Sequence, residues 1–138
     1  MIRVVLDTSV LVSAVISPTG PNAQVFDLIV ADRIRPCLTD ALIAEYHRVF
    51  EYERLRHLSR RRIAKLRGLL EAVSVRAKPR GRLKISDHED DNRVYECAAA
   101  TRADYIVTEN TKHFQQPHKS TAIVTARQLL RLLEAGQV

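Results

Sequence analysis

Short apolar runs alternate along the chain with longer stretches in which apolar residues recur every three or four positions. The short runs are typical of buried strands, and the periodic stretches are typical of amphipathic helices. Strands are expected at the run within residues 2–9 that stops at Asp7, at 34–38, 105–108 and 122–124, with a weaker strand pattern at 73–76. Helices are expected at 8–16, 22–31, 40–50, 59–72, 91–102 and 126–135.

This alternation predicts the fold class. Strands that alternate with helices form a mostly parallel sheet, joined by right-handed crossovers and covered by helices on both faces. A chain of 138 residues without internal repeats is expected to form a single α/β domain over residues 1–138. The order of the strands within the sheet is left open by the residues.

Charge is distributed unevenly along the chain. The net charge is +6, but residues 54–84 hold twelve lysine or arginine residues and one acid, Glu71, so the remainder is net negative. A basic tract attracts phosphates, and an acidic remainder can gather carboxylates for a separate purpose. The alternative is that the basic residues form an ordinary solvated helix face and loop.

The sequence carries no pattern of a membrane or secreted protein. Its longest apolar run, residues 10–16, is interrupted by Ser13 and is too short to span a bilayer. The N-terminus lacks the order of segments that a secretory signal requires, so we expect a cytoplasmic protein without a membrane partner. Cys37 and Cys97 lack redox or zinc spacing and are expected to be reduced packing residues.

Polar residues interrupt the apolar pattern where the elements meet. Asp7 follows the first strand and Asn110 follows residues 105–108, at the strand ends where ligands of parallel sheets bind. Glu45 and Asp91 each share a helix stripe with apolar residues at spacings of three, four and seven. A buried carboxylate is costly without a partner, so each of these acids requires a cation, a donor or a proton.

Each acid also has a purely structural explanation. Asp7 could cap the helix that begins at residue 8, and Asp91 could cap the helix that it opens. Glu45 could pair with Arg48, which lies three residues further along the same helix. Taken together the acids favour another explanation, because carboxylates that converge at strand ends repel each other unless a divalent cation neutralises them.

An oxygen-only site of this kind suits Mg²⁺ or Mn²⁺. Such an ion lowers the pKa of a bound water and stabilises charge on a phosphoryl oxygen, which favours hydrolysis of a phosphodiester bond. The sequence has no Gly-rich phosphate loop, no nucleophile elbow and no paired His or Cys spacing for zinc. His88 and His113 lie near the site in sequence and are expected at the surface or in supporting positions.

Four segments carry a family resemblance through their order and spacing. They are residues 5–9 (Val-Leu-Asp-Thr-Ser), 42–49 (Leu-Ile-Ala-Glu-Tyr-His-Arg-Val), 90–94 (Asp-Asp-Asn-Arg-Val) and 103–110 (Ala-Asp-Tyr-Ile-Val-Thr-Glu-Asn). Together they resemble the PIN-domain nucleases, in particular the VapC-like toxins of type II toxin–antitoxin systems. The resemblance spans almost the whole chain and implies a three-layer α/β/α sandwich with about five strands, metal-dependent ribonuclease activity and frequent dimerisation.

The resemblance also implies a site. Asp7, Glu45 and Asp91 match the three principal acidic positions of the family, which are metal ligands. Asn110 matches a fourth, catalytic position that is often Asp, so the chain departs there: an Asn carbonyl can coordinate but adds no charge, and a second metal ion is less well supported than the first. The polar positions that support the site by hydrogen bonds are matched by Ser9 and Thr108.

Two neighbouring residues are candidates for the third acidic position. Asp90 and Asp91 could both face the crevice, and Asp91 is preferred because it lies three residues before Val94, as the family's acid precedes its first apolar helix position. Asp87 is a further candidate for an outer contact.

The leading hypothesis is therefore a Mg²⁺- or Mn²⁺-dependent endoribonuclease that acts as the toxin of a toxin–antitoxin pair. Its expected partners are RNA, a cognate antitoxin and a second copy of the chain. The RNA backbone would be held without sequence readout by cations of the basic tract: Arg60, Arg61, Arg62, Lys65, Arg80 and Arg82.

Two other hypotheses remain. A PIN-like module that is weakened at Asn110 could bind RNA or a protein without cutting. A response-regulator-like phosphoacceptor uses a similar sheet, but its acidic pair, acceptor Asp and downstream Lys cannot be placed in this sequence.

Overall fold

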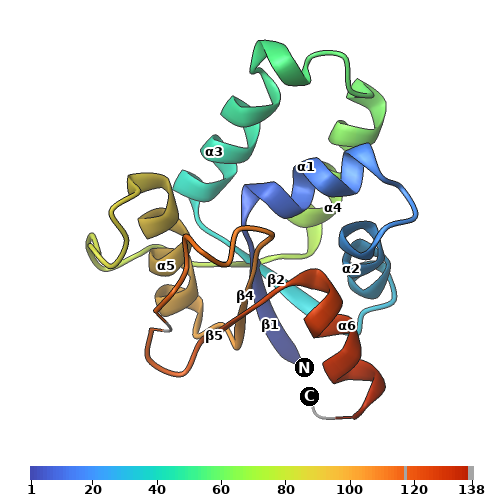
Figure 1. Cartoon of the computed structure of the whole chain (residues 1–138). Helices are drawn as coiled ribbons and strands as arrows, with labels where there is room; N and C mark the ends of the chain where they lie inside the picture. Colours follow the sequence, from blue (N-terminus) through green and yellow to red (C-terminus); the bar gives the residue numbers. More distant parts are fainter. Residues whose placement is uncertain (117, 137–138) are drawn as a thin grey trace.

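The structure is a computed structural model that describes residues 1–116 and 118–136. Its elements in chain order are β1 (Ile2–Leu6), α1 (Thr8–Ile16), α2 (Pro21–Val30), β2 (Ile34–Leu38), α3 (Asp40–Phe50), η1 (Glu53–Leu55), α4 (Arg60–Val73), β3 (Val75–Arg76), α5 (Glu89–Thr101), β4 (Tyr105–Val107), β5 (Ala122–Val124) and α6 (Ala126–Glu134) (Figure 1). Every predicted strand and helix is present, with ends that shift by at most two residues. The short 3₁₀ helix η1 was not predicted.

The strands form one parallel sheet in the order β3-β2-β1-β4-β5. β1 lies at the centre and pairs with β2 on one side and with β4 on the other. Leu6 is in register with Val107, so the residues that follow these two strands leave the sheet at the same edge. The backbone N–H of Asp7 continues this pairing and donates to the Val107 carbonyl at 2.9 Å.

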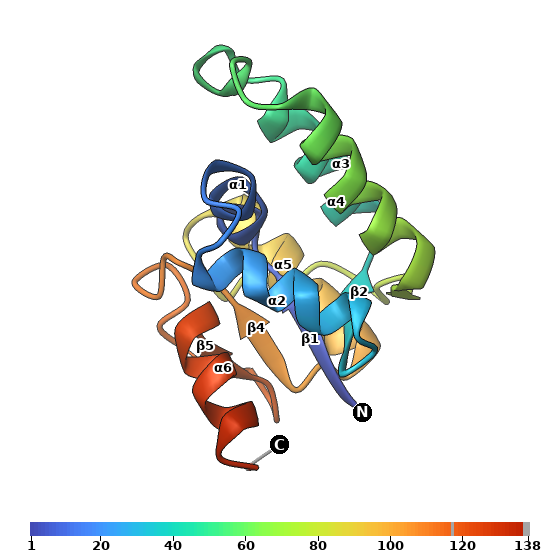
Figure 2. The ribbon, with the colours of Figure 1, turned by 90° about the vertical axis from the view of Figure 1, so that its right-hand side faces the viewer.

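Helices cover both faces of the sheet, which confirms the predicted three-layer α/β/α class. α5 packs against β1, β2 and β4, whereas α2 packs against β2 and α6 against β5. Figure 2 shows α2 and α6 in front of the sheet and α5 behind it. Val4, Val5 and Leu6 of the central strand are almost completely buried, as a strand between two helical layers requires.

Local hydrogen bonds begin several helices where the sequence predicts. The Thr39 hydroxyl accepts from the backbone N–H of Leu42 at 3.2 Å and caps α3. Thr125 and Gln128 form a reciprocal capping box at the start of α6. α5 differs from the prediction, because it begins at Glu89 and Asp91 therefore lies inside its first turn.

The described residues contain no helix that is both long enough and apolar enough to cross a membrane. Cys37 and Cys97 are buried and unpaired, consistent with packing residues.

Candidate active site

A cleft of about 320 Å³ opens where β1 and β4 end. Asp7 reaches it from the end of β1, Glu45 from α3, Asp91 from α5 and Asn110 from the segment after β4. The structure thus brings the four residues of the predicted site to one cavity. The other polar residues that line it are Thr8, Ser9, Ser13, Arg54, Asp90, Glu109 and His113.

The Asp7 carboxylate is held by two hydroxyl groups. Ser9 and Thr108 each donate to Asp7 Oδ2 at 2.8 Å. The same two hydroxyls accept from the backbone of the next segment: Ser9 Oγ from Glu109 N at 3.1 Å, and Thr108 Oγ1 from Asn110 N at 3.0 Å. The supporting contacts predicted for Ser9 and Thr108 are therefore present, and they also position the segment that carries Asn110.

Glu45 is the most deeply buried of the three acids, with 4% of its surface exposed. Its Oε2 accepts a hydrogen bond from the Thr8 hydroxyl. Burial, with a smaller contribution from the negative charges of Asp90 and Asp7, raises the pKa of Glu45 from 4.5 to about 7, against the lowering effect of the Thr8 hydrogen bond.

Asp91 is buried on the first turn of α5. Its Oδ2 lies 3.4 Å from the Ser86 hydroxyl and 3.5 Å from Nδ1 of His113. Burial raises its pKa, and the negative charge of Asp7 acts in the same direction. Because Asp7 raises the pKa of both Glu45 and Asp91, the three carboxylates interact electrostatically across the cleft.

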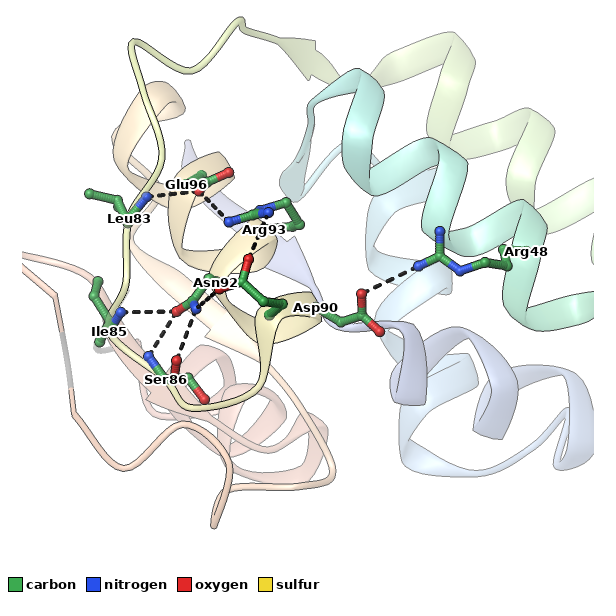
Figure 3. Close-up of polar contacts among 9 residues, drawn as sticks. Arg48, Leu83, Ile85, Ser86, Asp90, Asn92, Arg93 and Glu96 are labelled. Carbon is green, nitrogen blue, oxygen red and sulfur yellow. Dashed lines mark hydrogen bonds and ion pairs between the residues drawn. The ribbon is translucent and has the colours of Figure 1, made fainter.

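Asp90, the rival of Asp91, has a different environment. Its side chain is 66% exposed and forms an ion pair with Arg48 at 3.3 Å (Figure 3). It lines the rim of the same cleft, but its charge already has a partner on α3. The geometry therefore favours Asp91 as the third acid. Asp87 is exposed and does not line this cleft.

The structural explanations of the three acids do not hold. Asp7 occupies the cap position of α1 but makes no side-chain cap hydrogen bond. Asp91 is not a helix cap, because α5 begins two residues before it. Arg48 pairs with Asp90 rather than with Glu45. None of the three acids therefore makes the structural contact that the sequence offered as its explanation.

The donor set fits a hard divalent cation. Each of the three carboxylates has one oxygen bound to a hydroxyl, and the other oxygen accepts no hydrogen bond from the described part of the chain. Mg²⁺ and Mn²⁺ prefer oxygen ligands, and three carboxylates at one cleft supply them. A cation there would also favour the ionised forms of Glu45 and Asp91, which burial disfavours.

The segment after β4 adds an acid that the sequence reasoning missed. Glu109 lines the cleft, and its carboxylate accepts hydrogen bonds from Ser13 and from Asn22 Nδ2, the latter at 2.7 Å. Asn110, which was assigned the fourth position, also lines the cleft and is exposed. Glu109 follows the same strand end, so the rule that identified Asn110 could have included it.

The predicted RNA-binding cations fall into three groups. Arg60 donates to the carbonyls of Phe50 and Leu55 at 2.9 Å, and Arg62 to the carbonyl of Ala14 at 2.9 Å, so both guanidinium groups hold neighbouring backbone. Arg61 and Lys65 are exposed on α4.

Arg80 and Arg82 form the third group, away from the acidic cleft. They line a separate cavity of about 630 Å³ whose other basic members are Lys78, Arg102, His118 and Lys119. None of the four predicted cations on α4 lines this cavity.

Comparison with known proteins agrees with this arrangement. A family model described as "PIN domain" matches residues 3–112. The chain is also 30% identical over 104 residues to an uncharacterized protein of Methanocaldococcus jannaschii, MJ1680, an alignment that covers 74% of this chain and 67% of that protein.

Proposed function

This chain belongs to the PIN-domain family, whose members are generally metal-dependent nucleases, and we propose that it is a Mg²⁺- or Mn²⁺-dependent endoribonuclease. The observation that carries the proposal is that Asp7, Glu45 and Asp91 are all buried at one cleft, each with a carboxylate oxygen that lacks a hydrogen-bond donor in the described residues. This arrangement supports an ion site better than a structural role.

In the proposed mechanism Asp7, Glu45 and Asp91 would hold the ion. A bound ion would supply activation of the attacking water and compensation of the negative charge on the phosphoryl oxygens. The chain's own groups orient these ligands: Ser9 and Thr108 hold Asp7, and Thr8 holds Glu45.

Asn110 has a separate part in this proposal. We expect its amide to position the attacking water or a phosphate oxygen. This role is supported by its place on the cleft and by the hydrogen bond from its backbone N–H to Thr108.

Exposed cations are proposed to hold the RNA backbone. Arg61 and Lys65 on α4 and Arg80 and Arg82 beside the basic cavity are free to approach phosphates. Arg60 and Arg62 add positive charge to the same helix while they hold backbone carbonyls. Arg54 lines the acidic cleft itself and is a further candidate for a contact with the scissile phosphate.

The biological role is proposed from the family resemblance of the four sequence segments. They support the toxin of a toxin–antitoxin pair, with a small cognate antitoxin that covers the cleft, and a homodimer that acts in the cytoplasm. Co-purification of the chain with the product of a neighbouring gene, and the mass of the free protein in solution, would test these two partners.

Cleavage of a mixed RNA pool by purified protein tests the enzymatic proposal. Cuts are expected with Mg²⁺ or Mn²⁺ and not with a chelator, and they should vanish in Asp7→Asn. Asp27→Asn, an exposed change on α2, is the matched control and should cut like the original chain. Cutting by Asp7→Asn, or cutting in chelator, would overturn the proposal, whereas RNA binding without any cuts would favour the binding-module alternative.

A further inference from the structure

Beside the acidic cleft, two histidines and one of its acids form a second cluster of metal-binding groups. One ring nitrogen each of His88 and His113 and a carboxylate oxygen of Asp91 all lie within 4.8 Å of one another. The two imidazole rings are stacked, with centroids 4.7 Å apart and an angle of 22° between their planes. Two nitrogen donors and one oxygen donor thus converge at the first turn of α5.

The distance between two of these atoms matches that between two ligands of one metal ion better than that of a hydrogen bond. His113 Nδ1 and Asp91 Oδ2 are 3.5 Å apart, beyond the range of about 2.7–3.2 Å for a normal N–H···O bond. Two donors bound to one tetrahedral zinc ion at about 2.0–2.1 Å lie about 3.3–3.4 Å apart. The separation of this pair is therefore compatible with one shared ion, and the ligand atom of the exposed His88 lies within 4.8 Å of both.

The backbone on both sides of the cluster is held in place. The Asn92 side chain accepts from the N–H groups of Ile85 and Ser86 at 2.9 and 2.7 Å, which fastens the loop before α5 to the helix (Figure 3). Ser86 Oγ then accepts from His88 N at 3.1 Å. On the other side, His113 N donates to the Asn110 carbonyl at 2.9 Å. These hydrogen bonds hold the backbone on both sides of the cluster, and both histidine side chains are exposed.

We propose that His88, Asp91 and His113 bind a divalent transition-metal ion of the zinc and cobalt class. Imidazole nitrogen favours such ions over Mg²⁺, which prefers oxygen ligands throughout. Three protein ligands would leave a coordination position open on a tetrahedral ion. Both histidines also line a cavity of about 320 Å³ beside the cluster. Asp91 also lines the acidic cleft, so the two sites share this ligand, but the histidine site does not depend on nuclease activity.

Calorimetric titration with Zn²⁺ and, separately, with Mg²⁺ tests this site. The double variant His88→Asn/His113→Asn should bind Zn²⁺ at least about tenfold more weakly than the original chain, because it lacks both nitrogen ligands. His57→Asn, a change of an exposed histidine outside both cavities, is the matched control and should leave Zn²⁺ binding unchanged. Circular dichroism of each variant checks that the fold is retained, which is expected because both site histidines are exposed.

Asp7→Asn separates this proposal from the nuclease proposal. It removes a ligand of the acidic cleft only, so it should lower Mg²⁺ affinity while Zn²⁺ still binds and shifts the ring resonances of His88 and His113 in NMR spectra. Equal Zn²⁺ affinity in the original chain and the double histidine variant would overturn the histidine site. So would loss of Zn²⁺ binding in Asp7→Asn alone, because the ion would then lie among the cleft carboxylates.

Discussion

The Thr8 hydroxyl donates a hydrogen bond to the Glu45 carboxylate and thereby joins the first turn of α1 to the middle of α3. This contact orients one carboxylate oxygen and leaves the other available to the cleft. It does not cancel the cost of burial, since the pKa of Glu45 still rises from 4.5 to about 7.

Glu45→Gln should stabilise the metal-free protein at high pH. Between pH 4.5 and 7 the folded chain keeps the Glu45 proton that the unfolded chain loses, so stability of the original chain falls as pH rises through this window. Gln has no proton to lose and can still accept the Thr8 hydrogen bond. The variant should therefore gain up to about 3 kcal/mol at pH 8 and almost nothing below pH 4.5.

Urea unfolding at the two pH values, in chelator, measures this difference. A gain that is the same at both pH values would show that ionisation of Glu45 is not its cause.

Asp91→Asn and Asp90→Asn should behave differently. Asp91→Asn removes a proposed ligand and should reduce metal-dependent cleavage by at least about a hundredfold. Asp90→Asn removes only an exposed ion pair with Arg48, so stability should change by no more than about 1 kcal/mol and cleavage by less than tenfold. Parallel cleavage assays of the two variants decide which acid is the ligand. A larger loss of cleavage in Asp90→Asn than in Asp91→Asn would make Asp90 the ligand.

Thr108→Val should loosen the site without changing its charge. The completely buried hydroxyl donates to Asp7 and accepts from Asn110 N, and Val keeps its shape but makes neither bond. We expect a loss of about 1–3 kcal/mol in unfolding free energy and of about 10–100-fold in Mg²⁺ affinity. Thr108→Ser retains the hydroxyl and should recover the Mg²⁺ affinity in calorimetry; unchanged affinity in Thr108→Val would show that the hydroxyl does not support the ion site.

Asn110→Asp should strengthen Mg²⁺ binding. The change adds a negative charge to a cleft that five acidic residues already line, and charge count is a main determinant of affinity at oxygen sites. An increase of about tenfold is expected, with lower stability of the metal-free protein at pH 8 because the carboxylates repel each other. Calorimetric titration checks the first effect and thermal unfolding the second; unchanged affinity would place Asn110 outside the reach of the ion.

The double change Arg80→Ala/Arg82→Ala should lower the affinity for RNA and make that affinity less dependent on salt concentration. Each phosphate contact contributes about −0.7 to the slope of log affinity against log salt for a single strand, so the slope should become shallower by about 1.4. Filter binding of an uncut RNA analogue over a range of salt concentrations measures this slope. Arg33→Ala, at an exposed turn after α2, is the control. An equal change of slope in the control would show that the overall charge of the protein, rather than the basic cavity, causes the effect.

The sequence alone determined the elements and the acids. Apolar periodicity predicts every strand and α-helix, though not the short 3₁₀ helix η1, because burial of one face is a local requirement. The positions of Glu45 and Asp91 visibly break that periodicity. The same pattern placed Asp7 and Asn110 after strands, and a parallel sheet brings its strand ends to one edge. These features depend on neighbours in sequence, so they can be recognised without the fold.

Only the tertiary structure decided which groups touch. The order of the strands puts β1 beside β4, which allows Thr108 to reach Asp7 across 101 positions of sequence. It also distinguished Asp91 from Asp90 and brought Glu109 into the cleft. The stacking of His88 on His113 likewise joins two loops that are unrelated in sequence. Such contacts depend on how elements pack against each other, and packing is a property of the whole chain that local periodicity does not encode.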